Sequence, residues 1–328
     1  MTYANKLKQA VLDTKKEGFH ELALEIFRFQ AKEIPVYGEY LKHLKIDPAQ
    51  IGQIENIPFM PIEFFKSQTV LRKGVIPKLT FESSGTTGAN TSRHFVGDPD
   101  FYKEISIEIF ESIYGSLSDY CILALLPSYL ERQNSSLVFM AEQFIAKASE
   151  GSGFYLHDLP SLVEKAIGSL ASGKKVLILG VTFALLDLAE SYSCDLEGAI
   201  VMETGGMKGR RKEMLREEVH HILKKGLNLK TIHSEYGMTE LLSQFYATQD
   251  GLFQEPLWAR LLLRDMSDPF SLRARKTNGG INVIDLANID SCCFIETKDI
   301  GKQVGNGLVS VVGRFDNADI RGCNLLIS

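Results

Sequence analysis

The sequence predicts an α/β protein, with a mainly parallel sheet covered by helices and a small β-rich sub-lobe. Between residues 120 and 233, apolar runs alternate with helical stretches, which is typical of a parallel sheet with helices on both faces. After residue 255 the apolar pieces become shorter, which favours a second, more antiparallel sheet or a small barrel. We therefore expect one large domain over residues 1–328, with sub-lobes at about 1–254 and 255–328.

The expected elements follow from apolar periodicity along the chain. Residues 5–32 place apolar side chains among charges and predict amphipathic helix. Residues 46–71 are rich in proline and isoleucine, so we expect an irregular connector there, followed by a helix at 100–113. Strands are expected at 121–126, 176–179, 199–202 and 231–233, and helices at 135–148, 160–171, 182–191 and 209–224. In the β-rich sub-lobe, strands are expected at 260–263, 281–285, 293–297 and 308–312.

Composition excludes several classes of protein. The chain has 328 residues, a net charge of −5 and a pI of about 5.9, which argues against a nucleic-acid partner. No apolar stretch is long enough to span a bilayer, and the N-terminus lacks the apolar core of a signal peptide. The five cysteines form no CxxC pair, so neither disulfide scaffolding nor a structural zinc site is expected. These features indicate a cytoplasmic protein.

An octet at residues 81–88, Phe-Glu-Ser-Ser-Gly-Thr-Thr-Gly, is the most informative segment. Glycines let the backbone approach a ligand closely, and hydroxyls add donors to the free N–H groups of a turn. Such a loop suits the oxygens of a nucleotide triphosphate, although Ser/Thr/Gly runs are equally typical of solvated loops. The candidate phosphate-binding residues are Ser83, Ser84, Gly85, Thr86, Thr87 and Gly88.

Two further segments follow expected strands. Gly205 and Gly206 come after the strand at 199–202, where they suit either a tight turn or a flat ligand lying against the backbone. Residues 234–240 read Ser-Glu-Tyr-Gly-Met-Thr-Glu. Within this segment an aromatic ring, a hydroxyl and a carboxylate could stack a base, bond a phosphate and hold Mg²⁺. The alternative is a capped helix start.

Two more segments lie in the β-rich sub-lobe. Asp299 stands in a strand-end turn, where a carboxylate can accept hydrogen bonds from both hydroxyls of a ribose. Arg314 lies in the segment 313–322 and could reach a phosphate or the ribose. A turn aspartate and a surface salt bridge are the alternatives for these two residues.

The order and spacing of these segments resemble the adenylate-forming superfamily, which includes acyl-CoA synthetases, peptide-synthetase adenylation domains and firefly-type luciferases. The resemblance covers residue 55 onward and rests on the Ser/Thr/Gly loop, Tyr-Gly-x-Thr-Glu at 236–240, Thr-x-Asp at 297–299 and Gly-Arg-x-Asp at 313–316. Residues 127–137, 206–210 and 281–288 look more closely like the LuxE-type acyl-protein synthetases, with the phenylacetate–CoA ligases as the next relatives.

The resemblance implies a mechanism and a set of roles. A carboxylic acid, of which a fatty acid is the expected example, would attack the α-phosphate of ATP, giving an acyl-adenylate and pyrophosphate. Residues 83–88 would hold the β and γ phosphates, while Gly205 and Gly206 would line the junction of adenine and acyl pocket. The next motif would supply Tyr236 and Gly237 for adenine, Thr239 for the α-phosphate and Glu240 for Mg²⁺. Asp299 would hold the ribose, with Arg314 nearby.

The sequence also departs from the superfamily pattern. It ends soon after Asp316, so we expect no C-terminal lid domain and no lid lysine. Lys208, Arg210 and Arg211 are substitutes on charge alone, and Arg93 is the first cation after the phosphate loop.

LuxE-type enzymes pass the acyl group to a cysteine near their own C-terminus, and Cys323 stands in that place. A packing role is the alternative for Cys323, and packing is expected for Cys121, Cys194, Cys292 and Cys293. The resemblance also implies an acyl-reductase or acyltransferase protein partner.

Two other enzyme classes have less support in the sequence. Residues 168–175 nearly spell a Walker A motif, but the segment ends in Lys175 and precedes a strand, so a P-loop NTPase is rejected. The sequence contains no G-x-S-x-G, which argues against a serine hydrolase of the nucleophile-elbow type. A CoA ligase and a non-catalytic acyl-binding relative remain as alternatives.

Overall fold

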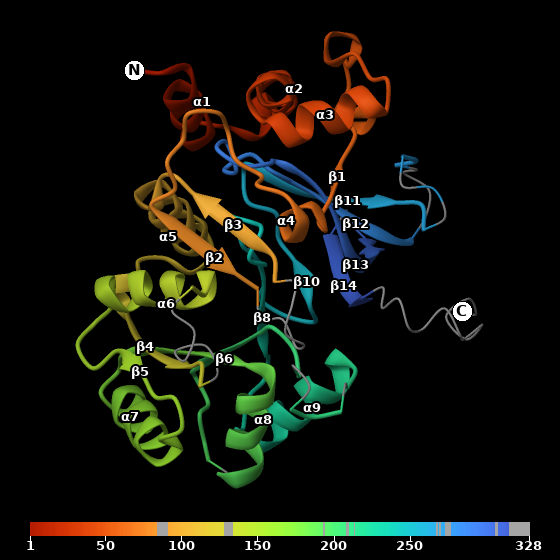
Figure 1. The fold of residues 1–328 in the computed structure, drawn as a ribbon. Coiled ribbons are helices and arrows are strands. Elements are labelled where there is room, and N and C mark those ends of the chain that lie inside the picture. The colour runs from red at the N-terminus through yellow and green to blue at the C-terminus, as the bar shows by residue number, and fades with distance from the viewer. Residues whose placement is uncertain are drawn as a thin grey trace.

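Two sheets and one hairpin organise the described residues in the computed structural model (Figure 1). The structure describes residues 1–83, 91–127, 134–192, 194–207, 210–212, 214–266, 268, 270–272, 277–305 and 308–314. The predicted α/β class is confirmed, with a mainly parallel sheet and an antiparallel sheet built largely from later residues.

The first sheet has the strand order β5-β4-β6-β7-β8-β9 and is parallel except for its last strand, β9. Its central strands β4 and β6 are almost wholly buried and apolar, as expected for a sheet covered on both faces. The strands are β4 (Tyr120–Leu125), β5 (Gly153–Phe154), β6 (Lys175–Val181), β7 (Ile200–Thr204), β8 (His233–Tyr236) and β9 (Phe245–Ala247).

The helices that accompany this part of the chain, as far as the structure describes it, are α5 (Pro99–Tyr114), α6 (Ser136–Lys147), α7 (Leu159–Ala171), α8 (Thr182–Ser191) and α9 (Arg216–Gly226). Asp98 and Asp158 cap α5 and α7 by accepting backbone N–H groups, and a proline follows each cap. The expected helix at 209–224 begins only at Arg216. The Glu218 side chain accepts the Leu215 N–H there, which satisfies a donor left free by the first turn.

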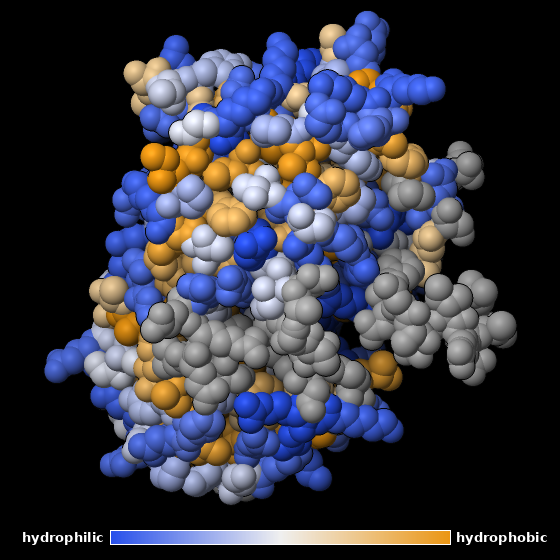
Figure 2. Space-filling view, in the orientation of Figure 1, coloured by the Kyte–Doolittle hydropathy of each residue, from blue (hydrophilic) through white to orange (hydrophobic). Residues whose placement is uncertain are grey.

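The amphipathic helix expected at 5–32 is present as two helices, and shorter elements follow. Helices α1 (Tyr3–Leu12) and α2 (Phe19–Glu33) are separated by a charged segment with a 3₁₀ turn at Lys16–Gly18, and α3 (Pro35–His43) follows. Helix α2 turns its apolar side inward, and Figure 2 shows mostly hydrophilic residues on the outer surface of α2 and α3. The connector then contains 3₁₀ turns at Pro48–Gln50 and Ile54–Asn56, strand β1 (Met60–Pro61) and α4 (Phe64–Ser67).

The second sheet has the order β10-β14-β13-β12-β11, and β1 adds to β13 in parallel. Its strands are β10 (Leu252–Phe253), β11 (Ala259–Arg264), β12 (Asn278–Asp285), β13 (Phe294–Val304) and β14 (Leu308–Arg314). Strand β13 extends well beyond the expected 293–297, because its second half pairs with β14. This pairing places Asp299 opposite Arg314.

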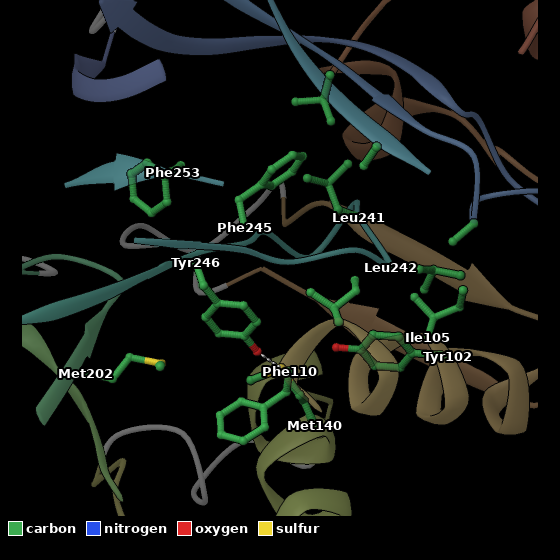
Figure 3. Close-up of a cluster of buried hydrophobic side chains, with 14 of the residues drawn as sticks. Tyr102, Ile105, Phe110, Met140, Met202, Leu241, Leu242, Phe245, Tyr246 and Phe253 are labelled. Carbon is green, nitrogen blue, oxygen red and sulfur yellow. Dashed lines mark hydrogen bonds between the residues drawn. The ribbon is translucent and has the colours of Figure 1, made fainter. Parts of the chain in front are cut away.

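A hairpin of β2 (Leu79–Glu82) and β3 (Arg93–Val96) flanks residues 84–90 and pairs Phe81 with His94. Helices α5 and α6 lie beside strand β9 of the first sheet, with apolar side chains between them (Figure 3). Tyr102 and Phe110 of α5 belong to this apolar cluster, and the Tyr246 hydroxyl of β9 lies 4.0 Å from Met140 Sδ of α6. No helix of the described ranges is long and apolar enough to cross a membrane.

Candidate active site

Tyr236, Asp299 and Arg314 lie together, although they come from three strands in two sheets. The Tyr236 hydroxyl donates to Asp299 Oδ2 over 2.8 Å, and Arg314 Nε lies 3.8 Å from Asp299 Oδ1. Burial raises the pKa of Asp299, and the Tyr236 bond and the charges of Arg314 and Arg264 offset this in part. The result is an oriented carboxylate at the junction of the sheets, with lone pairs suited to hydroxyl donors.

Tyr236 ends strand β8, so its ring lies at the carboxyl edge of the parallel sheet, where ligands bind in open α/β folds. The ring packs at a tilt against Phe245 and Phe253, with centroid distances of 6.0 and 5.6 Å. Burial raises its pKa well above the usual value, so the hydroxyl stays protonated and remains a donor to Asp299.

Thr239 and Glu240 follow in the turn after β8, and side chains from other elements hold their carbonyls. His94 Nδ1 lies 2.8 Å from the Thr239 carbonyl oxygen, and Asn288 Nδ2 donates to the Glu240 carbonyl over 2.8 Å. The Glu240 side chain is buried, which raises its pKa, and a hydrogen bond with the Ser92 side chain opposes that rise.

Ser83 closes the hairpin across residues 84–90. Its N–H donates to the Ser92 carbonyl over 3.0 Å, and its Oγ accepts the Ser92 N–H over 2.9 Å. The hydroxyl of Ser83 therefore helps to hold the base of the loop. Ser84, Gly85, Thr86, Thr87 and Gly88 lie outside the described residues, as does Cys323.

Gly205 and Gly206 follow β7 at the same edge of the sheet. Gly205 has φ +69°, a left-handed conformation that favours glycine. A Cβ added at Gly206 would meet no atom within 4 Å among the described residues, so this position borders open space. At Gly237 the opposite holds, because an added Cβ would collide with Glu235 Oε1.

Two buried carboxylates beneath this edge were not singled out from the sequence. Glu235 accepts a hydrogen bond from the Thr204 hydroxyl, and burial raises its pKa to about 7, with Glu203 adding to the rise. Glu203 contacts Arg216 and His220 of α9. An acidic residue inside an apolar strand is the signal that could have identified both.

The basic residues expected to replace the lid lysine, or to follow the phosphate loop, differ in their contacts. The Arg211 guanidinium makes two 2.9 Å contacts with the Glu190 carboxylate and also pairs with Asp187, so α8 holds it. Arg210 lies over the Phe183 ring at 5.5 Å, and Arg93 lies over Phe95 at 5.8 Å. Lys208 is outside the described residues.

No protein-family model matches the chain, and comparison with curated proteins finds no match. Solved structures do match. A crystal structure of 2-hydroxyisobutyryl-CoA ligase with 2-HIB-AMP and CoA has a TM-score of 0.66 and 14% identity, covering 97% of this chain and 70% of that one. ATP-bound MatB from Rhodopseudomonas palustris has a TM-score of 0.51 and 16% identity, covering 72% of this chain and 47% of that one.

An ATP-bound RpMatB-BxBclM chimera gives a TM-score of 0.54 at 15% identity, again with 72% and 47% coverage. The chain thus spans about half the length of MatB and this chimera. These structures are adenylate-forming enzymes. The chain has the fold of their adenylate-forming domain.

Proposed function

We propose that the protein uses ATP to activate a carboxylic acid as an acyl-adenylate. The observation that carries this proposal is the Tyr236–Asp299–Arg314 group at the carboxyl edge of the parallel sheet. It combines an aromatic ring for a base with an oriented carboxylate for ribose hydroxyls, in a fold shared with ATP-bound ligases.

The remaining residues are assigned around that group. The open space beside Gly206 would receive the junction of adenine and acyl group, and the absence of a Cβ at Gly237 leaves room for the Glu235 carboxyl. Thr239 would donate its hydroxyl to the α-phosphate. The loop 83–88 would bind the outer phosphates, with Ser83 holding its base and residues 84–88 offering backbone N–H groups. Positioning and charge neutralisation are the main demands of this chemistry.

Mg²⁺ is the metal that this chemistry implies. The described residues contain no cluster of three metal-binding side chains, but Mg²⁺ is commonly held by one or two carboxylates together with substrate phosphates. Glu240 fits that requirement, because it is a buried carboxyl beside the proposed phosphate-binding Thr239. Bound Mg²⁺ would neutralise phosphate charge, while Glu240 would orient it.

We further propose a fatty acid as the substrate and a protein thiol as the acceptor, as in LuxE-type acyl-protein synthetases. The thiolate would attack the acyl carbon, forming the C–S bond as the C–O bond to AMP breaks. Cys292 and Cys293 are buried, and burial raises the pKa of both thiols, to about 12 for Cys292. These surroundings disfavour thiolates at Cys292 and Cys293. Cys323 is the proposed acceptor because it stands near the end of the given sequence, where LuxE-type enzymes carry their acyl-accepting cysteine. The setting would be cytoplasmic, with an acyl-reductase or acyltransferase as partner.

ATP–pyrophosphate exchange with a panel of carboxylic acids, from acetate to long-chain fatty acids and phenylacetate, tests the proposal. We expect exchange with at least one acid class, and its near loss in Asp299→Ala. Glu197→Gln is the matched control, because the Glu197 carboxylate makes an exposed pair with Lys230 at 2.7 Å. Absence of exchange with every acid, together with absence of ATP binding, would show the proposal to be wrong.

A further inference from the structure

His94 is buried and makes one short contact with the candidate site. Its Nδ1 atom lies 2.8 Å from the Thr239 carbonyl oxygen, and the residue is 1% exposed. A carbonyl oxygen only accepts, so Nδ1 must carry the proton. Burial lowers the pKa of His94 to about 4, so at neutral pH the ring is uncharged and its single N–H serves this bond.

The bond between His94 and Thr239 connects two segments that are far apart in the sequence. His94 stands in β3, opposite Phe81 of β2, in the hairpin that flanks residues 84–90. Its ring meets Phe65 of α4 edge-on, with centroids 5.7 Å apart, which fixes the plane of the imidazole. The bond therefore ties the hairpin to the turn that carries Thr239 and Glu240.

The next carbonyl of the same turn is held by a second side chain, Asn288, which also neighbours His94. Asn288 Nδ2 donates to the Glu240 carbonyl over 2.8 Å, and Asn288 lies in the connection after β12 of the second sheet. Two successive peptide groups are thus fixed by side chains from two other elements. A turn held in this way presents its side chains in one orientation, which is what a site for a rigid charged ligand requires.

We propose that His94 is a positioning residue that orients the Thr239–Glu240 peptide, so that the Thr239 hydroxyl meets the α-phosphate of bound nucleotide and the Glu240 carboxylate meets its Mg²⁺. This inference rests on the proposed function, because it takes ATP as the ligand. It adds that the nucleoside and the phosphates of ATP are bound by separate parts of the site. Tyr236 and Asp299 would bind the nucleoside independently of His94, whereas affinity for the phosphates would depend on it.

Three substitutions distinguish this role from general packing. In His94→Asn the amide nitrogen is as many bonds from Cα as Nδ1, so it can replace the donor. In His94→Gln the amide lies one bond farther out, and His94→Leu has no donor. The measurements are dissociation constants for MgATP and for adenosine by equilibrium dialysis, with thermal unfolding to check that each variant is folded.

We expect MgATP to bind about tenfold more weakly to His94→Gln and His94→Leu, which corresponds to the loss of one buried hydrogen bond. His94→Asn should stay within about threefold of the unsubstituted protein, and adenosine affinity should change by less than about twofold in all three. Should His94→Leu fail to fold, the Asn and Gln pair decides the matter.

If the unsubstituted protein binds MgATP and His94→Gln binds it equally well, the proposed role of His94 is wrong while the proposed function stands. The role of His94 is also overturned if MgATP and adenosine lose the same affinity, because that result indicates a packing defect. If the unsubstituted protein binds neither ligand, the proposed function fails, and the inference fails with it.

Discussion

The Tyr236 hydroxyl donates to Asp299 Oδ2 over 2.8 Å, and this bond joins the parallel sheet to the antiparallel one. Tyr236 ends β8 and Asp299 lies in the middle of β13, opposite Arg314. The bond occupies one lone pair of one carboxylate oxygen. The carboxylate is thereby fixed in orientation while it keeps further acceptor capacity for ribose hydroxyls.

The first prediction compares how much Asp299 and Tyr236 each contribute to nucleotide binding. Asp299→Asn replaces one acceptor oxygen by a donor, so adenosine and MgATP should both bind about 10–100-fold more weakly, at the scale of one or two charge-assisted bonds. Tyr236→Phe keeps the aromatic ring and leaves the Asp299 carboxylate in place. Its affinity for adenosine and MgATP should therefore fall by less than about tenfold. Equilibrium dialysis measures both constants. Unchanged adenosine binding in Asp299→Asn would remove Asp299 from the ribose site.

The second prediction compares two glycines of the site. Gly206→Ala should leave the free energy of unfolding within about 0.5 kcal/mol, because the added Cβ meets no described atom within 4 Å. The same methyl should lower the rate of ATP–pyrophosphate exchange if ligand occupies that space. Gly237→Ala should instead destabilise the fold by about 1–3 kcal/mol, since its Cβ collides with Glu235 Oε1. Urea unfolding and exchange assays of both variants check this, and full exchange activity in Gly206→Ala would place the ligand elsewhere.

Much of the fold was predictable because buried strands and capped helices leave strong local patterns. The apolar runs of β4 and β6, and the Asp-Pro and Asp-x-Pro starts of α5 and α7, identify these elements directly. The hairpin β2–β3 was missed, since its strands have four residues each and alternate weakly. The extension of β13 was missed too, because only its pairing with β14 makes residues 298–304 a strand.

In the candidate site, too, local sequence motifs identify residues, whereas the contacts between distant residues come from the fold. The motifs identify Tyr236, Thr239, Glu240 and Asp299 as residue types, but not the contacts among them. His94 carries no local signal, because its role depends on a bond to a residue 145 positions away. Glu235 is visible as an acid in a buried strand, yet its raised pKa depends on the burial and neighbours that the fold creates.

The third prediction concerns pH. Burial raises the pKa of Glu235 from 4.5 to about 7, so the folded state keeps a proton that the unfolded chain releases. The stability that this group contributes is therefore complete below pH 4.5 and is lost as pH rises through 7. Glutamine stays neutral, so the stability of Glu235→Gln relative to the unsubstituted protein should improve by about 3 kcal/mol from pH 4.5 to 8.

Urea unfolding of both proteins across that range measures the difference directly. Taking the difference cancels the titrating groups that do not interact with Glu235, including His94, whose lowered pKa acts in the opposite direction. Glu197→Gln serves as the exposed control. A difference between the two proteins that stays constant from pH 4.5 to 8 would contradict the raised pKa.

The last prediction addresses the acyl acceptor. Incubation with ATP, Mg²⁺ and a radiolabelled fatty acid that supports exchange should leave a hydroxylamine-labile label on the protein, since hydroxylamine cleaves thioesters. Cys323→Ser should abolish that label and leave ATP–pyrophosphate exchange intact, because adenylation precedes the thiol step. Cys194→Ser is the matched control, as burial raises the pKa of this half-buried thiol and disfavours its thiolate. A label that persists in Cys323→Ser would assign the acceptor to another residue, and a labelled CoA thioester formed on adding CoA, without protein label, would favour a CoA ligase.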